Sequence, residues 1–404
     1  MAHDVIIIGG GPAGMMAGLL LARAGVSVLV LEKHGDFLRD FRGDTVHPST
    51  MEILDQLGML GRFLKRPHDR IDLIEGVMAG QPLVIGDLRF LKTAAPFVAM
   101  MPQWEFLDFL KGEAAAFAGF AVRMAADVER LVEEGGRIVG VQLAGGEELR
   151  ASRLVLAADG RNSIVRRNHL LTVTELGAPM DVFWFSIPKR AEGKRRLRGI
   201  FEAGRIMVLI DRGSYWQCAF VFAKGTAELI KGRGLAAFLA EVETAAPDVA
   251  PLSPHITSFD QISLLNVALD RLDCWHRPGL LAIGDAAHAM SPIGGVGINL
   301  AVQDAVAAAN CLAAPLAAGL GVDDLLHKVE ERRLFPTRMV QRAQKLAQDA
   351  MIGALLKPGA TMVRPPLPIR LLNRFPLLRR IPGRLVGLGI RRERARSPLA
   401  NTGP

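Results

Sequence analysis

The sequence has little of what defines several common protein classes. Among its 404 residues there are three cysteines and one tyrosine. The cysteines, Cys218, Cys274 and Cys311, lie far apart and form no CxxC pair and no cysteine–histidine pattern. This excludes a disulfide framework, predicts no bound metal, and is typical of a reduced, intracellular environment.

Long apolar runs and a leader segment are also missing. No stretch reaches the roughly 18 consecutive apolar residues that are needed to cross a bilayer. Residues 1–4 carry no basic leader, and the short apolar run after them meets glycine at once. We therefore expect a cytoplasmic protein with neither signal peptide nor membrane anchor.

Acidic residues are scarce in only one part of the chain. The formal net charge is +8, yet ten arginines and one acid, Glu393, lie between Arg364 and Arg396. This tail alone carries +9, which leaves the rest of the chain near −1. No nucleic-acid-binding motif accompanies the arginines, so we expect no nucleic-acid partner.

Hydrophobic periodicity predicts an α/β fold with two interleaved parts. A buried strand at 5–8, a glycine-rich turn, an apolar helix at 15–24 and a strand at 27–31 form a parallel βαβ unit. Buried strands of the same type are predicted at 153–158 and 280–283. A hairpin is predicted with strands at 120–129 and 137–143, and an antiparallel sheet, apart from the βαβ part, with strands at 181–188, 198–210 and 216–222.

The first turn fits the dinucleotide pattern G-x-G-x-x-G. The first glycine permits a tight turn, the second lets the backbone approach a pyrophosphate, and the third lets the helix pack on the strand. Glu32, at the end of the next strand, is placed to accept hydrogen bonds from a ribose, and Lys33 follows it. The alternative is a structural turn without a ligand. The turn reads Gly9-Gly10-Gly11-Pro12-Ala13-Gly14.

Two more motifs follow buried strands. One is Asp159-Gly160-Arg161-Asn162-Ser163-Ile164-Val165-Arg166. The other begins Gly284-Asp285-Ala286-Ala287-His288 and continues to Pro292, Gly295, Gly297, Ile298 and Asn299. With the first turn they resemble, in order and spacing, the class A flavoprotein aromatic hydroxylases, the family of p-hydroxybenzoate hydroxylase and the ubiquinone-biosynthesis hydroxylases. The resemblance covers about residues 1–350.

This resemblance implies FAD as cofactor and a Rossmann-like FAD-binding domain interleaved with an antiparallel-sheet substrate domain. The implied reaction is hydroxylation of a phenolic or N-heteroaromatic substrate with NAD(P)H and O₂ through a flavin C4a-hydroperoxide. The domains would be residues 1–70, 97–172 and 271–350 for FAD, 71–96 and 173–270 for substrate, and 351–404 as a basic, helical C-terminal segment.

Three other activities fit the same scaffold. A reductase or dehydrogenase would keep the FAD and change the reaction. A halogenase would need the W-x-W-x-I-P signature, of which residues 183–188 give only a faint echo, and a catalytic lysine near it, whereas Lys189 is expected in solvent. A protein that only binds FAD and transfers electrons is the non-enzymatic alternative.

The resemblance also assigns roles to single residues. Asp285 would accept from the ribityl hydroxyls, the amides of 295–299 would face the negatively charged end of the reduced flavin, and Pro292 would lie where oxygen adds. Asp159 would touch FAD, or would cap the next helix. Arg42 and Gln103 would lie near FAD, or be a loop arginine and a helix cap. A structural role is the alternative that we favour or weigh equally for His47, His288 and Arg166, and ordinary sheet packing is the one that we favour for Trp184, Tyr215 and Trp216.

The middle sheet would form the wall of the substrate pocket. Its aromatic candidates are Trp184, Tyr215 and Trp216, and any phenol-to-phenolate relay would depend on Tyr215 or on solvent, because there is no other tyrosine. Arg205 and Arg212 are isolated, which favours a neutral or heterocyclic substrate. The catalytic candidates are thus Pro292, Tyr215 and His47.

The arginine-rich tail has two interpretations. Its leucines and arginines suit peripheral contact with an anionic membrane, whereas docking on the FAD domain of its own chain is the alternative that we favour. Pro376 and Pro382 interrupt any long amphipathic helix. The expected oligomeric state is a monomer or a homodimer.

Overall fold

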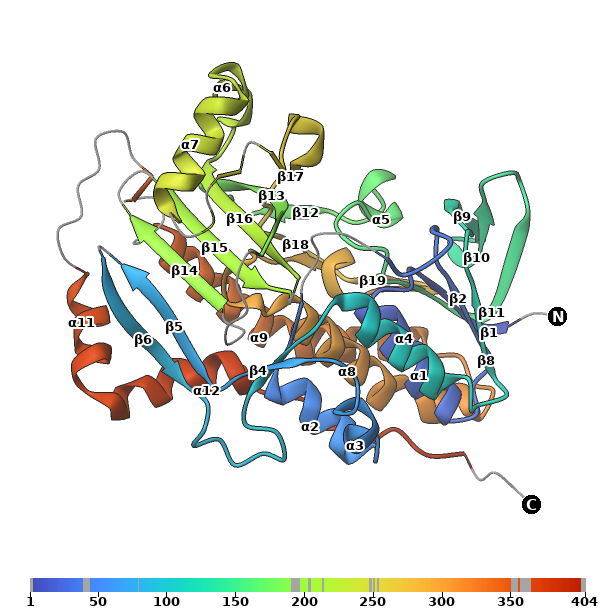
Figure 1. Ribbon diagram of the computed structural model, residues 1–404. Coiled ribbons are helices and arrows are strands. Elements are labelled where there is room, and N and C mark those ends of the chain that lie inside the picture. The colour runs from blue at the N-terminus through green and yellow to red at the C-terminus, as the bar shows by residue number, and fades with distance from the viewer. Residues whose placement is uncertain are drawn as a thin grey trace.

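The computed structural model describes residues 3–38, 44–78, 80–189, 197–202, 205–212, 214–246, 249, 251–252, 254–349, 355–356 and 365–400. Its two large sheets lie side by side with helices packed around and between them (Figure 1). The predicted α/β class, with a Rossmann-like parallel sheet, an antiparallel sheet and C-terminal helices, is confirmed.

The first sheet has a parallel core. Its strands are short, apolar and buried on both faces, as parallel strands covered by helices must be. An antiparallel hairpin of β9 (Val128–Glu134) and β10 (Arg137–Leu143) extends from it. The strand order is β19 (His276–Arg277), β20 (Leu280–Ala282), β11 (Glu148–Ala157), β1 (His3–Ile8), β2 (Val28–Leu31) and β8 (Phe120–Arg123).

Helices cover this sheet and form one continuous core with it. The long helix α8 (Gly297–Ala317) packs on α1 (Pro12–Arg23), and α1 packs on α4 (Gln103–Ala114). In the described part of the chain, Ile293–Ala317 is apolar and long enough to cross a bilayer, but 72% of it is buried in the protein. It is therefore a core helix. The others here are α2 (Pro48–Gln56), α3 (Leu60–Phe63), α5 (Ile164–Arg167) and α9 (Leu326–Ala347).

The second sheet is almost wholly antiparallel; only β14 and β5 run parallel. Helices α6 (Ala227–Gly232) and α7 (Leu235–Ala245) lie over one face (Figure 1), where α7 buries Phe238 against sheet phenylalanines. The strand order is β17 (Ser263–Leu265), β13 (Met180–Pro188), β16 (Tyr215–Ala223), β15 (Arg205–Asp211), β14 (Leu197–Glu202), β5 (Leu73–Met78) and β6 (Gln81–Asp87).

Two three-stranded sheets lie outside the two large ones. One contains β12 (Val173–Glu175), β18 (Asp270–Leu272) and β21 (His288–Ala289). The other contains β3 (Thr45–Val46), β7 (Val98–Met100) and β4 (Asp69–Ile71).

Two predicted strands differ from those observed. The stretch 120–129 is divided at Ala125, which has a φ of +53°, so that β8 joins the parallel sheet and β9 begins the hairpin. The stretch 198–210 is two strands, β14 and β15, which pair as a hairpin. The first break carries no glycine or proline in the sequence, whereas the second coincides with Glu202-Ala203-Gly204-Arg205, a turn-type sequence that the strand prediction ran through.

The tail folds onto the rest of the protein. It forms α11 (Leu367–Arg374), a short 3₁₀ helix over Pro376–Arg379, and α12 (Arg380–Leu388), which lie along β6 and α2 (Figure 1). An extended segment then reaches α1, where the Ala400 amide donates to the Arg23 carbonyl over 2.9 Å. Pro376 begins the 3₁₀ helix that follows α11, as expected of a helix-breaking proline, whereas Pro382 is accommodated in the first turn of α12.

Candidate active site

The three sequence motifs meet at the carboxyl ends of neighbouring parallel strands. The Ala158 amide donates to the Ile8 carbonyl over 2.8 Å, and the Ile283 amide donates to the Ala157 carbonyl over 2.9 Å. Gly9 and Gly284 both have positive φ values, and a Cβ at Gly9 would lie 2.5 Å from the Ala158 oxygen. The turns after β1, β11 and β20 therefore form one continuous surface.

The turn after β1 leaves a place for an anion. A Cβ at Gly14 would lie 1.9 Å from the Gly9 oxygen, whereas one at Gly11 would meet nothing within 4 Å. Pro12 and Ala13 begin α1, and the capping residue Gly11 offers no side-chain hydrogen bond. The first amides of α1 thus face open space, which is how helix N-termini bind phosphate.

Glu32 lies at the end of β2, beside this turn. It is 9% exposed and accepts hydrogen bonds from the amides of Gly10, at 3.0 Å, and His34, at 3.1 Å. These bonds fix its carboxylate next to the glycine turn. Lys33, the next residue, is exposed to solvent.

An ion pair joins the second and third motifs. Arg161 Nε lies 3.2 Å from Asp285 Oδ2, and Arg161 Nη2 donates to the Met290 carbonyl over 3.0 Å. Asp159 Oδ2 accepts from the Ile164 amide over 2.7 Å, so the predicted helix-capping contact is present. Its other oxygen is buried and has no partner among the described residues. Burial raises the pKa of Asp159.

In the loop after Pro292 some backbone groups are hydrogen-bonded within the protein, and others border open space. The Thr45 hydroxyl donates to the Gly295 carbonyl over 2.9 Å, whereas a Cβ at Gly297 would meet nothing within 4 Å. Ile298 is buried in the first turn of α8. The Asn299 side chain accepts from the His47 amide and the Thr50 hydroxyl, both at 2.8 Å. Asn299 therefore holds α2 against α8, and only its backbone remains for a ligand.

One face of the second sheet is turned toward this loop. Strand alternation places Trp184, Val208 and Ala219 on that face, in a cluster that Ile293 also joins. Tyr215 lies four residues before Ala219 on β16, so its side chain is on the same face of the sheet. Trp216 packs instead in the cluster on the α7 side, so it does not belong to the expected pocket wall.

A largely buried ion pair connects this sheet to the first. Arg212 donates to Asp44, which leads into β3, and its Nε donates to Gln217 Oε1 over 2.9 Å. Asp44 also accepts from the backbone of Gln103, the first residue of α4. Burial raises the pKa of Asp44 to about 7, in spite of Arg212. Arg212, which the sequence placed in no basic cluster, is thus held by an acid and an amide.

Two candidates need a different description. His47 is 1% exposed, and its Nδ1 lies 2.7 Å from the Val386 carbonyl of α12. Burial lowers the pKa of His47 to about 4. It is thus covered by the tail, which favours a structural role.

Arg42 and the side chain of Arg205 lie outside the described residues. Lys189, expected in solvent, is 10% exposed and lies 2.6 Å from Asp211.

His288 belongs to a fully buried charge cluster. Its Nε2 lies 2.6 Å from Asp304 Oδ2, while Arg333 Nε donates to the other oxygen over 2.8 Å. Burial alone would raise the pKa of Asp304, but His288 and Arg333 hold it below its usual value. Arg166 likewise pairs with Asp270, at 2.7 Å. Both motif residues thus make the structural contacts that we weighed for them.

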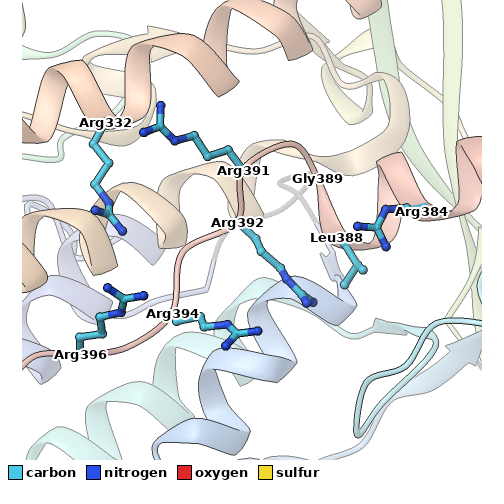
Figure 2. A pocket seen from close by; sticks show the side chains of 8 residues that line it. All are labelled: Arg332, Arg384, Leu388, Gly389, Arg391, Arg392, Arg394 and Arg396. Carbon is cyan, nitrogen blue, oxygen red and sulfur yellow. The ribbon is translucent and has the colours of Figure 1, made fainter.

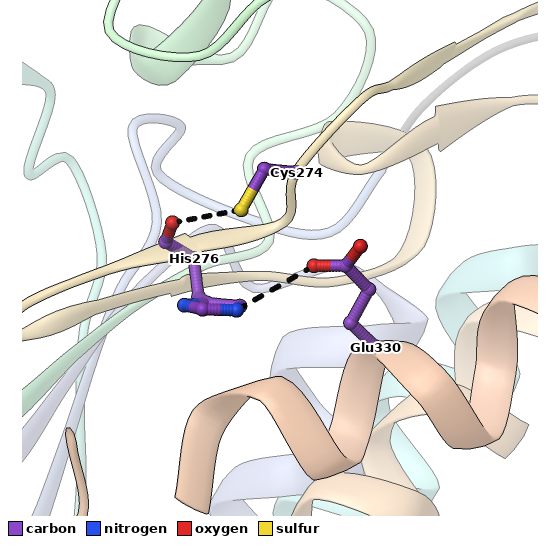
Figure 3. A group of neighbouring side chains, drawn as sticks. All are labelled: Cys274, His276 and Glu330. Carbon is purple, nitrogen blue, oxygen red and sulfur yellow. Dashed lines mark hydrogen bonds and ion pairs between the residues drawn. The ribbon is translucent and has the colours of Figure 1, made fainter. Parts of the chain in front are cut away.

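A group of potential metal ligands lies outside these motifs. Cys274, His276 and Glu330 bring one ligand atom each to within 4.8 Å of one another (Figure 3). The thiol donates to the His276 carbonyl, and Glu330 accepts from the Trp275 amide over 2.9 Å. Burial raises the pKa of Cys274 and so disfavours the thiolate that binds metals. The sequence missed this group because Glu330 comes from α9.

Known proteins resemble this chain over its full length. Residues 2–343 match the FAD binding domain family. The 6-methylpretetramide 4-monooxygenase of Streptomyces rimosus is 33% identical, over 100% of this chain and 96% of that protein. The chain belongs to the FAD-dependent monooxygenases. The 6-hydroxy-3-succinoylpyridine 3-monooxygenase of Pseudomonas putida is 28% identical, over 85% of this chain and 88% of that protein.

A solved structure agrees in fold. The p-nitrophenol 4-monooxygenase from Pseudomonas putida has a TM-score of 0.75 at 20% identity, over 97% of this chain and 99% of that one. The predictions of FAD, of NAD(P)H as co-substrate and of an enzyme agree with membership of these monooxygenases.

The described residues fit FAD. Open space lies at Gly11 and Gly297, the first turn of α1 has no side-chain cap, and the second Asp159 oxygen is buried without a partner among the described residues. These features suit a pyrophosphate at the helix N-terminus and a hydroxyl donor such as those of a ribityl chain. Sequence reasoning missed Arg161, which was quoted in a motif without a role, and missed Asp304 and Arg333 because no local pattern connects them to His288.

Proposed function

We propose that this monooxygenase hydroxylates an aromatic ring, phenolic or N-heteroaromatic, with NAD(P)H and O₂. The observation that carries the proposal is the apposition of the loop 292–297 to the sheet face that carries Trp184. Ile293 packs in the same cluster as that face, so an aromatic substrate bound beside the cofactor loop would contact an apolar wall. The relatives act, by name, on 6-methylpretetramide and a hydroxylated pyridine.

Bound FAD supplies the oxygen-activating chemistry, and the protein supplies position and exclusion of water. The α1 amides and Glu32 hold the dinucleotide end. Asp285, fixed by Arg161, accepts from the ribityl hydroxyls. The amides from Val296 to Asn299, at the positive end of α8, would face the negatively charged part of the cofactor, whereas the Gly295 amide donates to the Pro292 carbonyl.

We assign proton transfer to Tyr215, which lies on the same face of β16 as Ala219 and follows the turn that holds Arg212. A phenolic substrate would pass its proton to Tyr215 or to water. Arg212 is held by Asp44 and Gln217, so it is not free to pair with a substrate carboxylate. This supports a neutral substrate.

The decisive experiment is oxygen transfer under ¹⁸O₂. Purified holoenzyme is supplied with NADH or NADPH and a panel of phenols and N-heterocycles, and products are analysed by mass spectrometry. We expect a substrate that both accelerates NAD(P)H oxidation and gains one ¹⁸O atom. NAD(P)H oxidation with a reduced product and no ¹⁸O would instead favour the reductase alternative. Absence of NAD(P)H oxidation with every compound would favour the electron-transfer partner.

The halogenase alternative receives no support from Lys189. Its ammonium group lies 2.6 Å from Asp211 and 5.5 Å from the Trp216 ring centre, on the face of the sheet turned away from the cofactor loop. A bromide or chloride added to the ¹⁸O assay should therefore leave no halogenated product.

A further inference from the structure

The outer face of the tail is apolar and open to solvent. Its large apolar side chains are between 38% and 70% exposed, a dense group for 19 consecutive residues of a folded protein. In both helices they recur at a spacing of four residues, which places them in a stripe along one face. They are Leu367, Leu371 and Phe375 at α11, Leu377 and Leu378 in the 3₁₀ helix, and Ile381 and Leu385 on α12.

Arginines border this stripe in a regular way. An arginine directly precedes four of the exposed apolar residues, so its side chain leaves the helix about 100° from the stripe. Long arginine side chains in that position can cover apolar surface with their stems while the guanidinium reaches polar groups. The four pairs are Arg370-Leu371, Arg374-Phe375, Arg380-Ile381 and Arg384-Leu385.

The opposite side of the same helices is fixed to the protein. Ile369 is buried with Met78 and Leu83. Gly383 lies so close to β6 that a Cβ there would come within 2.0 Å of the Asp87 oxygen, and Leu388 is buried beside Leu88. The exposed stripe is therefore held outward by packing on its inner side.

The chain after α12 adds a concentrated positive charge. A cavity of about 350 Å³ is lined by six arginines, with Leu388 and Gly389 at its edge (Figure 2). Arg332 pairs with the buried Glu393, and Arg392 pairs with Glu52. Within the described part of the chain, the other four arginines have no ion-pair partner. They are Arg384, Arg391, Arg394 and Arg396.

From this arrangement we infer that the tail face binds the surface of an anionic phospholipid bilayer. The apolar stripe enters the boundary between headgroups and acyl chains, and the bordering arginines and the arginine-lined cavity contact lipid phosphates. Because the rest of the chain has a net charge near −1, the net positive charge that attracts an anionic surface comes from this tail. That orients the protein with α11 and α12 toward the bilayer.

A second copy of the chain is a poorer occupant of the same face. A two-fold contact presents the same patch from both subunits, so the arginines would oppose one another. Glu393 is the one acid between residues 365 and 400, and it is 2% exposed. The patch therefore offers no negative charge to a copy of itself, whereas anionic lipid complements both its charge and its apolar stripe.

Vesicle flotation of the full-length holoenzyme tests this inference. Vesicles of phosphatidylcholine alone are compared with vesicles that contain 30% phosphatidylglycerol, at about 0.1 M salt. We expect the protein to float with the anionic vesicles and to stay unbound with the neutral ones. Equal binding to both compositions, or binding to neither, would overturn the inference.

Two triple variants separate its components. Arg370→Gln, Arg374→Gln and Arg384→Gln together should weaken binding about 100-fold, since each arginine near an anionic surface contributes about fivefold. Leu371→Ser, Phe375→Ser and Ile381→Ser should weaken it at least about tenfold. Circular dichroism and bound FAD establish that each variant is folded.

Matched variants elsewhere on the surface are the controls. They replace exposed basic residues (Lys65, Arg130 and Arg338 by Gln) and exposed apolar residues (Leu229, Phe335 and Leu346 by Ser). We expect wild-type vesicle binding from both. If they weaken binding as much as the tail variants do, the tail is not the docking face.

Two further outcomes would assign the face to another occupant. If inorganic phosphate at equal ionic strength releases the protein and the serine triple variant binds normally, the arginines form a site for free anions only. If sedimentation velocity shows a dimer that the serine variant converts to a monomer, and vesicles are not bound, the face is covered by a second copy.

Discussion

Arg212, in the turn between β15 and β16, donates a hydrogen bond to Asp44, the residue that directly precedes β3. The contact links the substrate-side sheet to the cofactor side at a largely buried point. Because burial raises the pKa of Asp44 to about 7, the charge of this link changes within the working range of many enzymes.

Removing the arginine should therefore have a pH-dependent cost. In Arg212→Gln the buried Asp44 carboxyl is protonated and neutral at pH 6. At pH 8.5 folding must either bury its unpaired negative charge or keep it protonated far above its pKa in the unfolded chain, and both lower the free energy of unfolding. We expect a larger loss of unfolding free energy at pH 8.5 than at pH 6, approaching about 3 kcal/mol. Urea unfolding at the two pH values measures it. An equal loss at both would contradict the raised pKa, and Asp44→Asn/Arg212→Gln should remove the difference.

His47 predicts acid sensitivity of the opposite sign. Burial lowers its pKa to about 4 in the folded protein, whereas an exposed histidine has a pKa of about 6.5, so the folded state binds fewer protons. Above pH 6.5 His47 is neutral in both states and costs no stability. As the pH falls toward 4 the unfolded state takes up a proton that the folded state does not, which lowers the free energy of unfolding by about 3 kcal/mol. His47→Gln should flatten the decline seen by urea unfolding between pH 7 and 4.5. The exposed His327→Gln serves as control and should leave the decline unchanged.

Two glycines of the first turn should respond differently to alanine. Gly11→Ala adds a methyl group that meets nothing in the protein, so the apoprotein should keep its stability while FAD affinity falls at least about tenfold. Gly14→Ala places a Cβ 1.9 Å from the Gly9 oxygen and should cost about 3 kcal/mol of unfolding free energy. Flavin fluorescence titration and thermal unfolding of the apoproteins separate the two effects. Unchanged FAD affinity in Gly11→Ala would place the pyrophosphate elsewhere.

The buried cluster around Asp304 should be a major determinant of stability. Asp304→Asn leaves His288 and Arg333 without their shared acceptor, and breaking such a buried pair costs about 3–5 kcal/mol. Guanidinium unfolding tests this, with the exposed Asp324→Asn as the matched control. A loss below about 1 kcal/mol would mean that water replaces the carboxylate.

The two tryptophans of the second sheet give a test of the pocket wall. Trp184 lies on the face toward the cofactor loop, and Trp216 lies on the α7 side. Trp184→Ala should raise the KM for the aromatic substrate about tenfold or more with little change in FAD binding. Trp216→Ala should mainly lower stability. Equal KM values in the two variants would show that the substrate does not contact this face.

Sequence alone determined the parallel βαβ unit, the three motifs and the arginine-rich tail. These features are local: a β-branched run, a glycine that needs a positive φ such as Gly9, or an arginine count can be recognised without knowing what lies nearby. The strand break at Ala125 escaped because no glycine or proline marks it, and the break between β14 and β15 escaped although Gly204 lies there.

Tertiary structure alone decided which side chains meet. Asp304 joins His288 and Arg333 from three separate elements, Arg212 finds Asp44 across 168 positions of sequence, and the parity of β13 and β16 sets Trp184 and Trp216 on opposite faces. It also decided that His47 is covered by the tail and that the tail's apolar stripe faces outward. Such pairings depend on how distant segments pack, and no pattern within one segment encodes the position of another.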